Sequence, residues 1–430
     1  MSTTRYPDYE RPCGWNALLP ARACNDALKA DVACDVAVIG GGYTGLAAAR
    51  RCAELRPEAR IAVLDASEAG EGNPGRNSGF MLDISLANDA EPGQIERMTV
   101  CNRLIAGAML DIGNLVKKHD IPCALTRTGT YRAAAGESGI AALREYRAFL
   151  EAASLPHELL EGRQISERLG TDFYREGLYS PQCWLVQPAA LIRGLADNLP
   201  PAVSLYENSP AVSIERSRGN WAVRTPIATI HAPRLIIANN AFCKQLGIGQ
   251  SRMVAMYTYA ALTEPFSAQI LDTLGNQSTW GLLPAHRLGS TLRRTPDGRL
   301  LIRSLYGYEK EANNDGIAGK LKRSLQRRYP QLTALRFASV WSGATGFTMN
   351  GAPLWGEYAP GLYVSAGCNG GGVVKGTLFG RLLAELAFGR ETADIPALFG
   401  KASWMPPEPL RHIGFRILSA LERYKGRAEV

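Results

Sequence analysis

The chain has 430 residues, of which 46% are hydrophobic and 20% are charged, and its formal net charge is +8. This length exceeds what one hydrophobic core usually supports, so we expect two domains. The basic residues form no run that contains aromatic residues, and no apolar run reaches about 18 residues, which argues against nucleic-acid binding and against a transmembrane helix.

The N-terminal part of the chain predicts a β-α-β unit. Residues 1–32 predict an irregular segment, and CDVAVIGGG predicts a buried strand that ends in a glycine turn. Residues 44–56 are rich in Ala, Leu and Arg and predict a helix, and ARIAVLDA predicts a second buried strand. Two such strands joined by a helix imply a parallel sheet that is covered on both faces.

The rest of the chain alternates between predicted helices and strands. Helical spacing covers residues 94–120, and further helices are expected at GIAALREYRAFLEAASL, PAALIRGLADNL and VVKGTLFGRLLAELAFG. Strands are expected within AVSLYENSPAVSIERSRGNWAVRT and at TGTYRAA, RLIIANNA, RMVAMYTYAALTEP, RLLIRSLYGY and GLYVSAGCNGGG. The final segment, PLRHIGFRILSALERYKGRAEV, predicts a basic amphipathic helix that either packs on the body of the protein or touches a membrane, and we favour packing.

The first glycine turn carries the pattern G-x-G-x-x-G at Gly40, Gly42 and Gly45. The first glycine permits a tight turn, the second lets the backbone approach a pyrophosphate, and the third lets helix and strand pack closely. The N-terminus of the following helix favours an anion. Asp65 ends the second strand, where a carboxylate accepts hydrogen bonds from an unphosphorylated ribose. We therefore favour a site for NAD or FAD over a turn without a ligand.

Two further glycine-rich segments favour FAD. Residues 68–80, EAGEGNPGRNSGF, follow Asp65 directly and are suited to lie along a large cofactor, with a surface loop as the alternative. Residues 367–376, GCNGGGVVKG, repeat the strand, glycine and helix arrangement. This helix N-terminus suits the pyrimidine end of a flavin, where negative charge develops on reduction, with a simple helix-entry turn as the alternative.

Together these segments resemble the FAD-dependent amine and amino acid oxidoreductases of the D-amino-acid oxidase (DAO) superfamily, in particular gamma-glutamylputrescine oxidase-like and glycine/sarcosine oxidase-like members. QPAALIRGLA, RLIIANNA, TPDGRLLIRS and WSGATGFTMNGAPLWG add to the resemblance in the family's order. It implies an α/β fold: a discontinuous, glutathione-reductase-like Rossmann domain that binds FAD, over residues 1–95, 155–240 and 335–430. An α+β substrate domain on an antiparallel sheet is expected over residues 96–154 and 241–334.

The resemblance also implies a set of FAD-binding positions, from the pyrophosphate loop to the pyrimidine edge of the flavin. These positions are Gly40, Gly41, Gly42, Tyr43, Thr44, Gly45, Asp65, Ala66, Gly75, Arg76, Asn77, Ser78, Val212, Ala238, Asn239, Gly367, Asn369, Gly370, Gly371, Gly372 and Val373. Relatives that bind flavin covalently often carry a Cys shortly before the last strand. VWSGATGFTMNGAPLW contains none, so we predict non-covalent FAD. Gly371 stands where relatives have a His, so no histidine base is expected there.

The implied activity is oxidation of a C–N bond in an amine or amino acid, including carboxylate-bearing ones. Hydride transfer to flavin N5 gives an imine, which hydrolyses to a carbonyl compound and an amine, and oxygen or another acceptor takes up the electrons. Two alternatives stay open. One is a flavin monooxygenase, for which no convincing Gly-Asp motif is present, and the other is a non-catalytic flavin-binding subunit.

Five residues are candidates for contact with the substrate. Tyr257 and Tyr259 alternate on one strand and are expected to face the flavin, unless they only pack within a sheet. Arg293 and Arg303 flank the TPDG turn, and each is a bidentate partner for a substrate carboxylate or else a surface arginine. Lys375 lies one position beyond the carboxylate-binding Lys of sarcosine oxidase-like relatives.

The cysteine and histidine residues bear on compartment and metals. Nine cysteines are scattered without a C-x-x-C pair, and the N-terminus lacks the basic and then apolar pattern of a secretory signal. Both observations predict reduced thiols and a cytoplasmic protein. The five histidines are isolated, so no metal site is expected.

Overall fold

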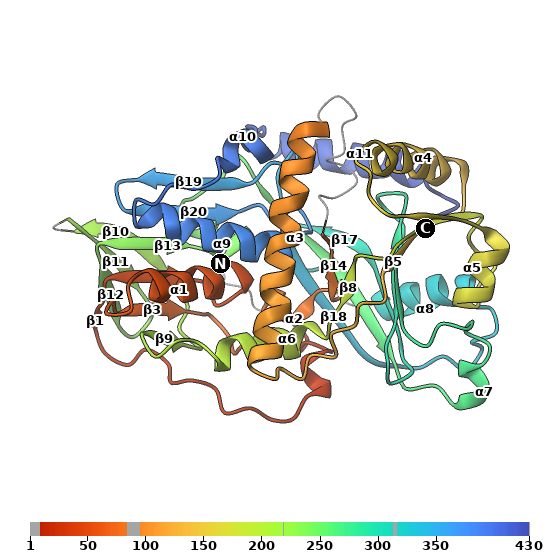
Figure 1. The fold of residues 1–430 in the computed structure, drawn as a ribbon, viewed down its shortest axis with the longest axis horizontal. Coiled ribbons are helices and arrows are strands. Elements are labelled where there is room, and N and C mark those ends of the chain that lie inside the picture. The colour runs from red at the N-terminus through yellow and green to blue at the C-terminus, as the bar shows by residue number, and fades with distance from the viewer. Residues whose placement is uncertain (1–8, 84–94, 218, 313–315, 430) are drawn as a thin grey trace.

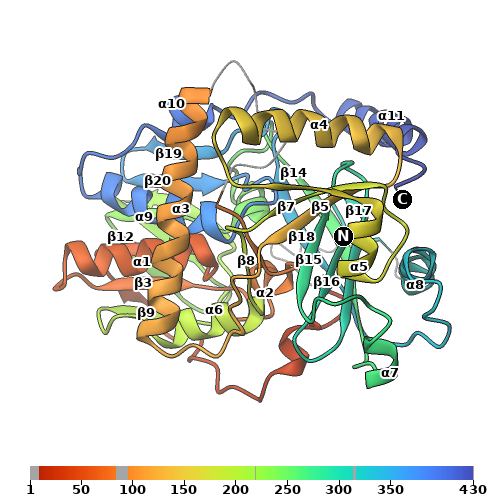
Figure 2. The ribbon, with the colours of Figure 1, turned by 45° about the vertical axis from the view of Figure 1, so that its right-hand side comes forward.

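The computed structural model describes residues 9–83, 95–217, 219–312 and 316–429 (Figure 1). Two large sheets lie side by side in it, with helix α3 (Ile95–Lys118) standing across the region between them. The same arrangement is visible from a second direction in Figure 2. The first residue of the predicted helix 94–120 lies outside the described residues, and α3 covers the rest of that range except its last two residues.

The first sheet has six strands in the order β19-β20-β13-β2-β3-β9. Its strands are β2 (Val36–Ile39), β3 (Ile61–Leu64), β9 (Val203–Tyr206), β13 (Arg234–Ile237), β19 (Leu354–Ala359) and β20 (Leu362–Ala366). Five of them pair in parallel, and β19 is an antiparallel edge strand. The predicted β-α-β unit is confirmed as β2, α1 (Tyr43–Leu55) and β3.

Each face of this sheet is covered by a different layer. Val36, Val38 and Ile236 pack against α1 and against α9 (Val374–Ala387), which lie alongside each other (Figure 1). Ala37 and Ile237, one position along their strands, point the other way because side chains alternate across a strand. They pack on a smaller sheet of β1 (Val32–Ala33), β10 (Ser213–Ser217), β11 (Asn220–Arg224) and β12 (Thr229–Ala232). Burial on both faces explains why these strands are continuous apolar runs.

The second sheet has eight strands in the order β18-β14-β17-β16-β15-β5-β7-β6. They are β5 (Thr130–Ala134), β6 (Glu158–Glu161), β7 (Glu176–Ser180), β14 (Val254–Thr263), β15 (Trp280–Pro284), β16 (Thr291–Arg294), β17 (Leu300–Tyr308) and β18 (Phe337–Phe347). All pairs are antiparallel except β15 with β5. Helices α4 (Glu137–Ala152), α5 (Gly162–Leu169) and α8 (Ile317–Arg328) pack around it.

The strand pairing departs from the expected domain ranges at three strands. β6, β7 and β18 lie in ranges that we expected in the FAD-binding domain, yet they pair within the eight-stranded sheet. Conversely, α3 lies in a range expected in the substrate domain, although its buried side chains share a core with α9. Hydrogen-bond partners distant in sequence decide which sheet a strand joins, and its own residues do not reveal them.

The remaining elements connect these layers. They are η1 (Asn16–Leu18), α2 (Asn73–Arg76), β4 (Phe80–Met81), β8 (Trp184–Leu185), α6 (Pro188–Asp197), η4 (Asn240–Leu246), α7 (Ala268–Leu271), α10 (Ile395–Phe399) and α11 (Leu410–Lys425). Within the described residues, no helix is both long and apolar enough to span a bilayer.

Candidate functional site

A cavity of about 410 Å³ lies between the two large sheets. One wall comes from the carboxyl ends of β2, β3 and β20 and from the starts of α1 and α9. The other wall comes from strands β14, β17 and β18 of the eight-stranded sheet. Its volume lies in the usual range for small-molecule sites, which is about 300–1,000 Å³.

The first glycine turn has a geometry that only glycine permits. Gly40 has φ +108°, and a Cβ there would lie 2.8 Å from the carbonyl oxygen of Ala238. A Cβ on Gly45 would lie 1.8 Å from the carbonyl oxygen of Gly40. Gly42 is the N-cap of α1, and no side chain caps this helix end. The turn therefore presents backbone N–H groups and a positive helix end to the cavity.

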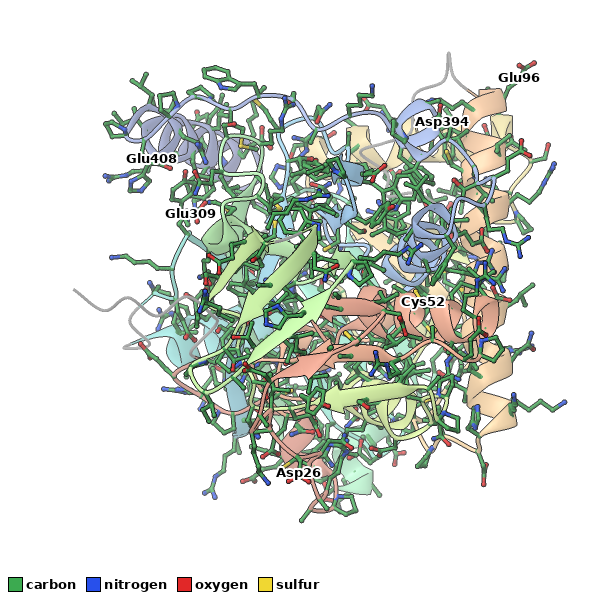
Figure 3. All side chains as sticks on the ribbon, turned by 90° about the vertical axis from the view of Figure 1, so that its left-hand side faces the viewer. Asp26, Cys52, Glu96, Glu309, Asp394 and Glu408 are labelled. Atoms are coloured by element: carbon green, nitrogen blue, oxygen red, sulfur yellow. The ribbon has the colours of Figure 1, made fainter. Side chains whose placement is uncertain are left out.

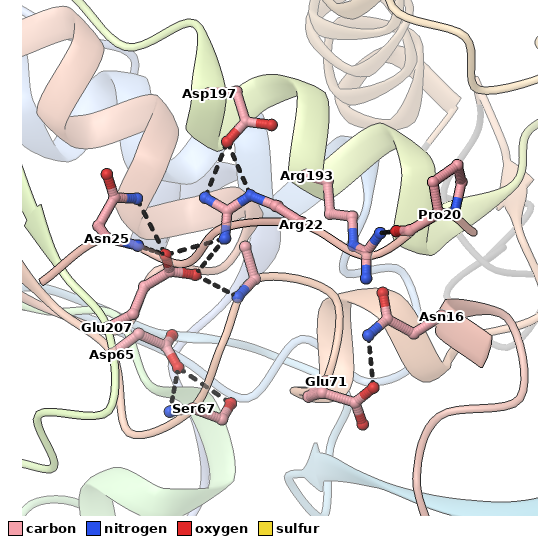
Figure 4. Close-up of polar contacts among 11 residues, drawn as sticks. Asn16, Pro20, Arg22, Asn25, Asp65, Ser67, Glu71, Arg193, Asp197 and Glu207 are labelled. Carbon is pink, nitrogen blue, oxygen red and sulfur yellow. Dashed lines mark hydrogen bonds and ion pairs between the residues drawn. The ribbon is translucent and has the colours of Figure 1, made fainter. Parts of the chain in front are cut away.

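Asp65 is held against this turn by hydrogen bonds. Its carboxylate accepts a hydrogen bond from the backbone N–H of Gly41 at 2.7 Å. It also accepts hydrogen bonds from the N–H of Ser67 at 2.9 Å and from the Ser67 hydroxyl at 3.2 Å (Figure 4). Burial raises the pKa of Asp65, and these hydrogen bonds oppose that effect. Both Asp65 and Ala66 line the cavity. The role of the Asp65 carboxylate as a partner of the ribose stays a prediction.

The second glycine-rich loop is fixed by Arg76. The Arg76 side chain is buried and donates hydrogen bonds to the carbonyl oxygens of Arg11, Glu71 and Ser342. Trp341 in β18 donates to the carbonyl oxygen of Arg76 at 3.0 Å. Arg76 lines the cavity, and its guanidinium is engaged with protein groups that hold the loop on the eight-stranded sheet.

The N-terminal segment packs over the outside of the same loop. Trp15 is buried and donates from Nε1 to the carbonyl oxygen of Asn77 at 2.8 Å. The Cys13 N–H donates to the Glu71 carboxylate at 2.9 Å, and Asn16 donates to the other oxygen of that carboxylate (Figure 4). The sequence predicted this segment only as irregular, whereas the structure makes it a support for the loop.

The third glycine-rich loop is shaped by Asn369. Its side chain accepts a hydrogen bond from the N–H of Thr348 at 2.9 Å and donates to the carbonyl oxygens of Gly351 and Gly367, each at 2.8 Å. Gly370 has φ +90°, as a glycine turn requires. A Cβ on Gly371 would lie 2.5 Å from Cε of Lys375, so the absence of a side chain at 371 leaves the room that Lys375 occupies.

Arg303 in β17 places a positive charge on the cavity wall that lies across from the glycine turns. Its Nε donates to Thr258 Oγ1 at 2.9 Å, and among the described residues it forms no ion pair with a carboxylate. Burial lowers the pKa of Arg303. Leu305 is an extra residue between the pairs Thr258–Tyr306 and Tyr259–Ser304, and its φ of +63° marks a β-bulge. Because of this bulge, Arg303 and Tyr306 both point to the cavity, and Ser304 also borders it.

The cavity contains most of the predicted positions but not all of them. Those that line it are Gly40, Gly42, Tyr43, Thr44, Asp65, Ala66, Arg76, Asn77, Ser78, Ala238, Asn239, Arg303, Gly370, Gly371, Gly372, Val373 and Lys375. Those that do not are Gly41, Gly45, Gly75, Val212, Tyr257, Tyr259, Arg293, Gly367 and Asn369. Near Val212, the cavity is lined by Ala211, and the Val212 N–H donates to the Arg224 carbonyl oxygen.

Three of the substrate candidates are placed away from the cavity. Tyr257 and Tyr259 do share a face of β14, but it is the face that packs in the core with α8 residues such as Leu321. Thr258, between them, therefore points to the cavity. Arg293 is buried, where it donates to the carbonyl oxygens of Ser78 and Val186, and burial lowers its pKa to about 10.

Several lining residues were missed by reasoning from the sequence. They include Phe80, Arg132, Asn240, Thr258, His286, Arg287, Tyr306 and Cys368. Cys368 and Asn240 had a usable signal, because each directly adjoins a predicted position. Arg132 and Arg287 had none, since neither belongs to a motif. Cys368 is a free thiol at the cavity, so the prediction of non-covalent FAD needs a direct test by mass spectrometry of the denatured protein.

The residues present fit a dinucleotide that spans the cavity. The glycine turns before α1 and before α9 both line the cavity. Neither helix has a side-chain cap at its N-terminus. Two buried polar atoms that border the cavity, Ser78 Oγ and Asn239 Oδ1, have no hydrogen-bond partner among the described residues. Buried polar atoms are nearly always paired, so these two are available to a ligand.

The amino-acid sequence is similar to those of known oxidoreductases. The chain is 28% identical to the probable oxidoreductase OrdL of Rhizobium meliloti (strain 1021), over 88% of this chain and 88% of that protein. It is also 28% identical to the gamma-glutamylputrescine oxidoreductase of Escherichia coli (strain K12), over 85% of this chain and 86% of that protein.

Comparison of structures confirms the predicted fold class. The crystal structure of glycine oxidase from Geobacillus kaustophilus aligns with a TM-score of 0.75 at 20% identity, covering 87% of this chain and 100% of that one. The family described as FAD dependent oxidoreductase (DAO) matches residues 35–386, which is most of the sequence. The protein therefore belongs to the DAO family of FAD-dependent oxidoreductases.

Proposed function

We propose that this enzyme oxidises the C–N bond of an amine or amino acid that carries a carboxylate. The observation that supports this most directly is Arg303, a half-buried guanidinium at the cavity whose only described hydrogen bond goes to the neutral Thr258 hydroxyl. Withdrawing a cation even partly from water is unfavourable unless an anion pairs with it. A substrate carboxylate supplies that anion and can accept two parallel hydrogen bonds from a guanidinium.

The charge of the cavity lining supports an anionic substrate as well. Arg132, Arg287 and Lys375 line the cavity in addition to Arg303. Asp65, at the opposite end, is the acidic residue of the described lining. A cleft lined by one sign of charge attracts ligands of the other sign, so a positively charged diamine without a carboxylate is disfavoured.

When bound, FAD supplies a two-electron acceptor. A substrate placed against it would give up a hydride equivalent from the carbon beside its nitrogen and the proton on that nitrogen, and would become a neutral imine. Water then adds to the imine and releases a carbonyl compound and an amine.

The side chains that line the cavity are proposed to orient the substrate so that its reacting carbon faces the cofactor. Correct placement of the reacting carbon lowers the barrier without a side-chain base, which agrees with glycine at position 371. Arg303 and Lys375 lie on opposite walls, β17 and the start of α9, so they can hold a carboxylate from two directions. The half built on the six-stranded sheet is proposed to hold FAD, and the eight-stranded sheet to provide the substrate wall.

The test is anaerobic bleaching of the bound flavin by a panel of amines. The panel contains secondary amines, N-methyl amino acids, gamma-glutamylated diamines and amino sugars, each with a carboxylate-free counterpart where one exists. We expect bleaching by at least one carboxylate-bearing amine without NAD(P)H. Bleaching that requires NAD(P)H would instead indicate a monooxygenase, and no bleaching by any amine would contradict the proposal.

A further inference from the structure

Helix α11 lies at the edge of the molecule, beside α4, and both of its ends are fixed (Figures 1 and 2). At its start, Glu408 accepts a hydrogen bond from the hydroxyl of Tyr308, and Figure 3 shows Glu408 on the outer edge with Glu309 beneath it. After its end, the carboxylate of Glu429 accepts hydrogen bonds from the N–H groups of Ala135 and Gly136. The orientation of α11 about its own axis is therefore determined.

The side of α11 that contacts the body is mostly small or polar. Phe415 packs against Tyr308, with ring centroids 5.0 Å apart. One carboxylate oxygen of Glu422 lies 3.4 Å from Nε2 of His286. Gly426, just beyond the helix, lies so close that a Cβ would be 2.2 Å from the His286 ring. Only one large apolar side chain of this helix thus faces the body.

The large apolar side chains of α11 instead point to solvent. They are 46–72% exposed and comprise Leu410, Ile413, Ile417, Leu418, Leu421 and Tyr424. None of the sixteen residues of α11, all of which the structure describes, is buried. Most of them are three or four residues apart, and Ile417 and Leu418 are adjacent, so that they form one continuous outward stripe, which we call the α11 stripe. Helix α11 therefore contacts the body, the alternative that we favoured, but it does so through its small and polar side, while its apolar side faces outward.

Cationic side chains accompany the α11 stripe. Arg416, Arg423, Lys425 and Arg427 are all exposed. The two acidic residues of the same segment, Glu422 and Glu429, are directed to the body, toward His286 and the start of α4. The outward surface of α11 is therefore apolar in the middle and positively charged around it.

We propose that α11 binds the protein to the surface of an anionic lipid membrane. A helix with an apolar stripe and flanking Arg and Lys lies in the interface plane, with its apolar side chains among the acyl chains and its cations at the phosphates. A second copy of the chain would cover the stripe too, but it would bring a second set of the same cations against the first. The net charge of +8 adds to that repulsion and to the attraction of an anionic surface.

The experiment is flotation of the FAD-loaded protein with lipid vesicles. We expect binding to phosphatidylcholine vesicles that contain phosphatidylglycerol, little binding to vesicles of phosphatidylcholine alone, and weaker binding in high salt because salt screens the charges. The variant Ile413→Ser/Ile417→Ser should bind at least about tenfold more weakly, since each isoleucine loses its favourable burial. Arg416→Gln/Arg423→Gln should lose the preference for anionic vesicles.

The matched control is Ile227→Ser, which removes an isoleucine that is 71% exposed on the turn before β12. It should bind vesicles as the wild type does. Flavin content and circular dichroism verify that every variant is folded. Equal binding by the double isoleucine variant and the control, or no binding of the wild type to anionic vesicles, overturns the proposal. A wild-type dimer in solution that the isoleucine variant dissociates would also overturn it, in favour of self-association.

Discussion

Arg303 is the residue on which the proposed substrate class depends. Hydrogen bonds to charged groups contribute about 1.5–3 kcal/mol each, so Arg303→Lys, which keeps the charge and loses the planar fork, should raise KM roughly 10- to 100-fold. The rise should appear with carboxylate-bearing amines and be absent with their carboxylate-free counterparts. Steady-state kinetics on both substrate types measures it.

Arg299→Lys is the matched control for this prediction. Arg299 precedes β17, pairs with Asp297 at 2.8 Å and does not line the cavity. The KM of the Arg299→Lys variant should therefore match that of the wild type. A similar rise in KM for both variants, or for substrates without a carboxylate, would show that Arg303 acts on the fold and not on the substrate.

Glu207 is expected to make the folding stability of the protein depend on pH in the acidic range. It is fully buried, and it accepts hydrogen bonds from Arg22 and from the N–H groups of Asn25 and Ala69 (Figure 4). Burial alone would raise the pKa of Glu207, but these hydrogen bonds and the Arg22 charge hold it below its ordinary value. A lowered folded-state pKa stabilises the protein above the unfolded value of about 4.3, and that stabilisation is lost as the pH falls through the lower folded value.

Glu207→Gln should therefore destabilise the protein by about 3–5 kcal/mol at neutral pH, because Arg22 loses its buried partner. It should also flatten the dependence of stability on pH between about pH 5 and pH 3. Urea unfolding at several pH values measures both effects. Glu215→Gln, which removes the exposed partner of Arg224, should cost less than about 1 kcal/mol. Equal losses in the two variants would contradict this account.

At the scale of elements, the site depends on the contact between α1 and α9. A Cβ on Gly380 in α9 would lie 2.0 Å from the carbonyl oxygen of Thr44, and Thr44 lines the cavity. Gly380→Ala must push the helices apart, at a cost of about 1–3 kcal/mol. Because both helix starts border the cavity, we expect weaker FAD binding, measured by titration of the apoprotein.

The control for this element is another helical glycine. Gly107 in α3 is exposed and has no atom within 4 Å of a Cβ position, so Gly107→Ala should leave FAD binding unchanged and stabilise the protein by about 0.5–1 kcal/mol. Unchanged FAD affinity in Gly380→Ala would show that the start of α1 tolerates displacement.

At the scale of the whole molecule, the cavity joins two sheets that have separate cores. A ligand held by both stabilises them together, so FAD should raise the unfolding temperature and merge unfolding into one transition. At a free concentration 100 times the Kd, the stabilisation is about 2.7 kcal/mol. Differential scanning calorimetry of the apoprotein with increasing FAD measures this. Two transitions of which FAD shifts only one would contradict a shared site.

Much of the cofactor side could be predicted from the sequence, because its determinants are local. The strand, glycine turn and helix around Gly40 and Gly45 are set by residues within a few positions of each other. The ordered glycine-rich segments then indicated the family. The substrate side was less predictable. Alternation shows that Tyr257 and Tyr259 share a face of β14, but the sequence does not say which layer covers that face.

The same limit explains the other differences. The bulge at Leu305 aims Arg303 and Tyr306 at the cavity, and it arises from the register between β14 and β17, which pair over about forty intervening residues. The amphipathic pattern of α11 likewise shows which side chains lie together, and the contacts of Glu422 and Gly426 decide that its apolar stripe faces outward. The sequence by itself determined the glycine turns and the buried strands, because backbone sterics and side-chain periodicity act over short distances. Tertiary structure alone decided which face meets the cavity, the core or the solvent, because that depends on partners that are distant in the chain.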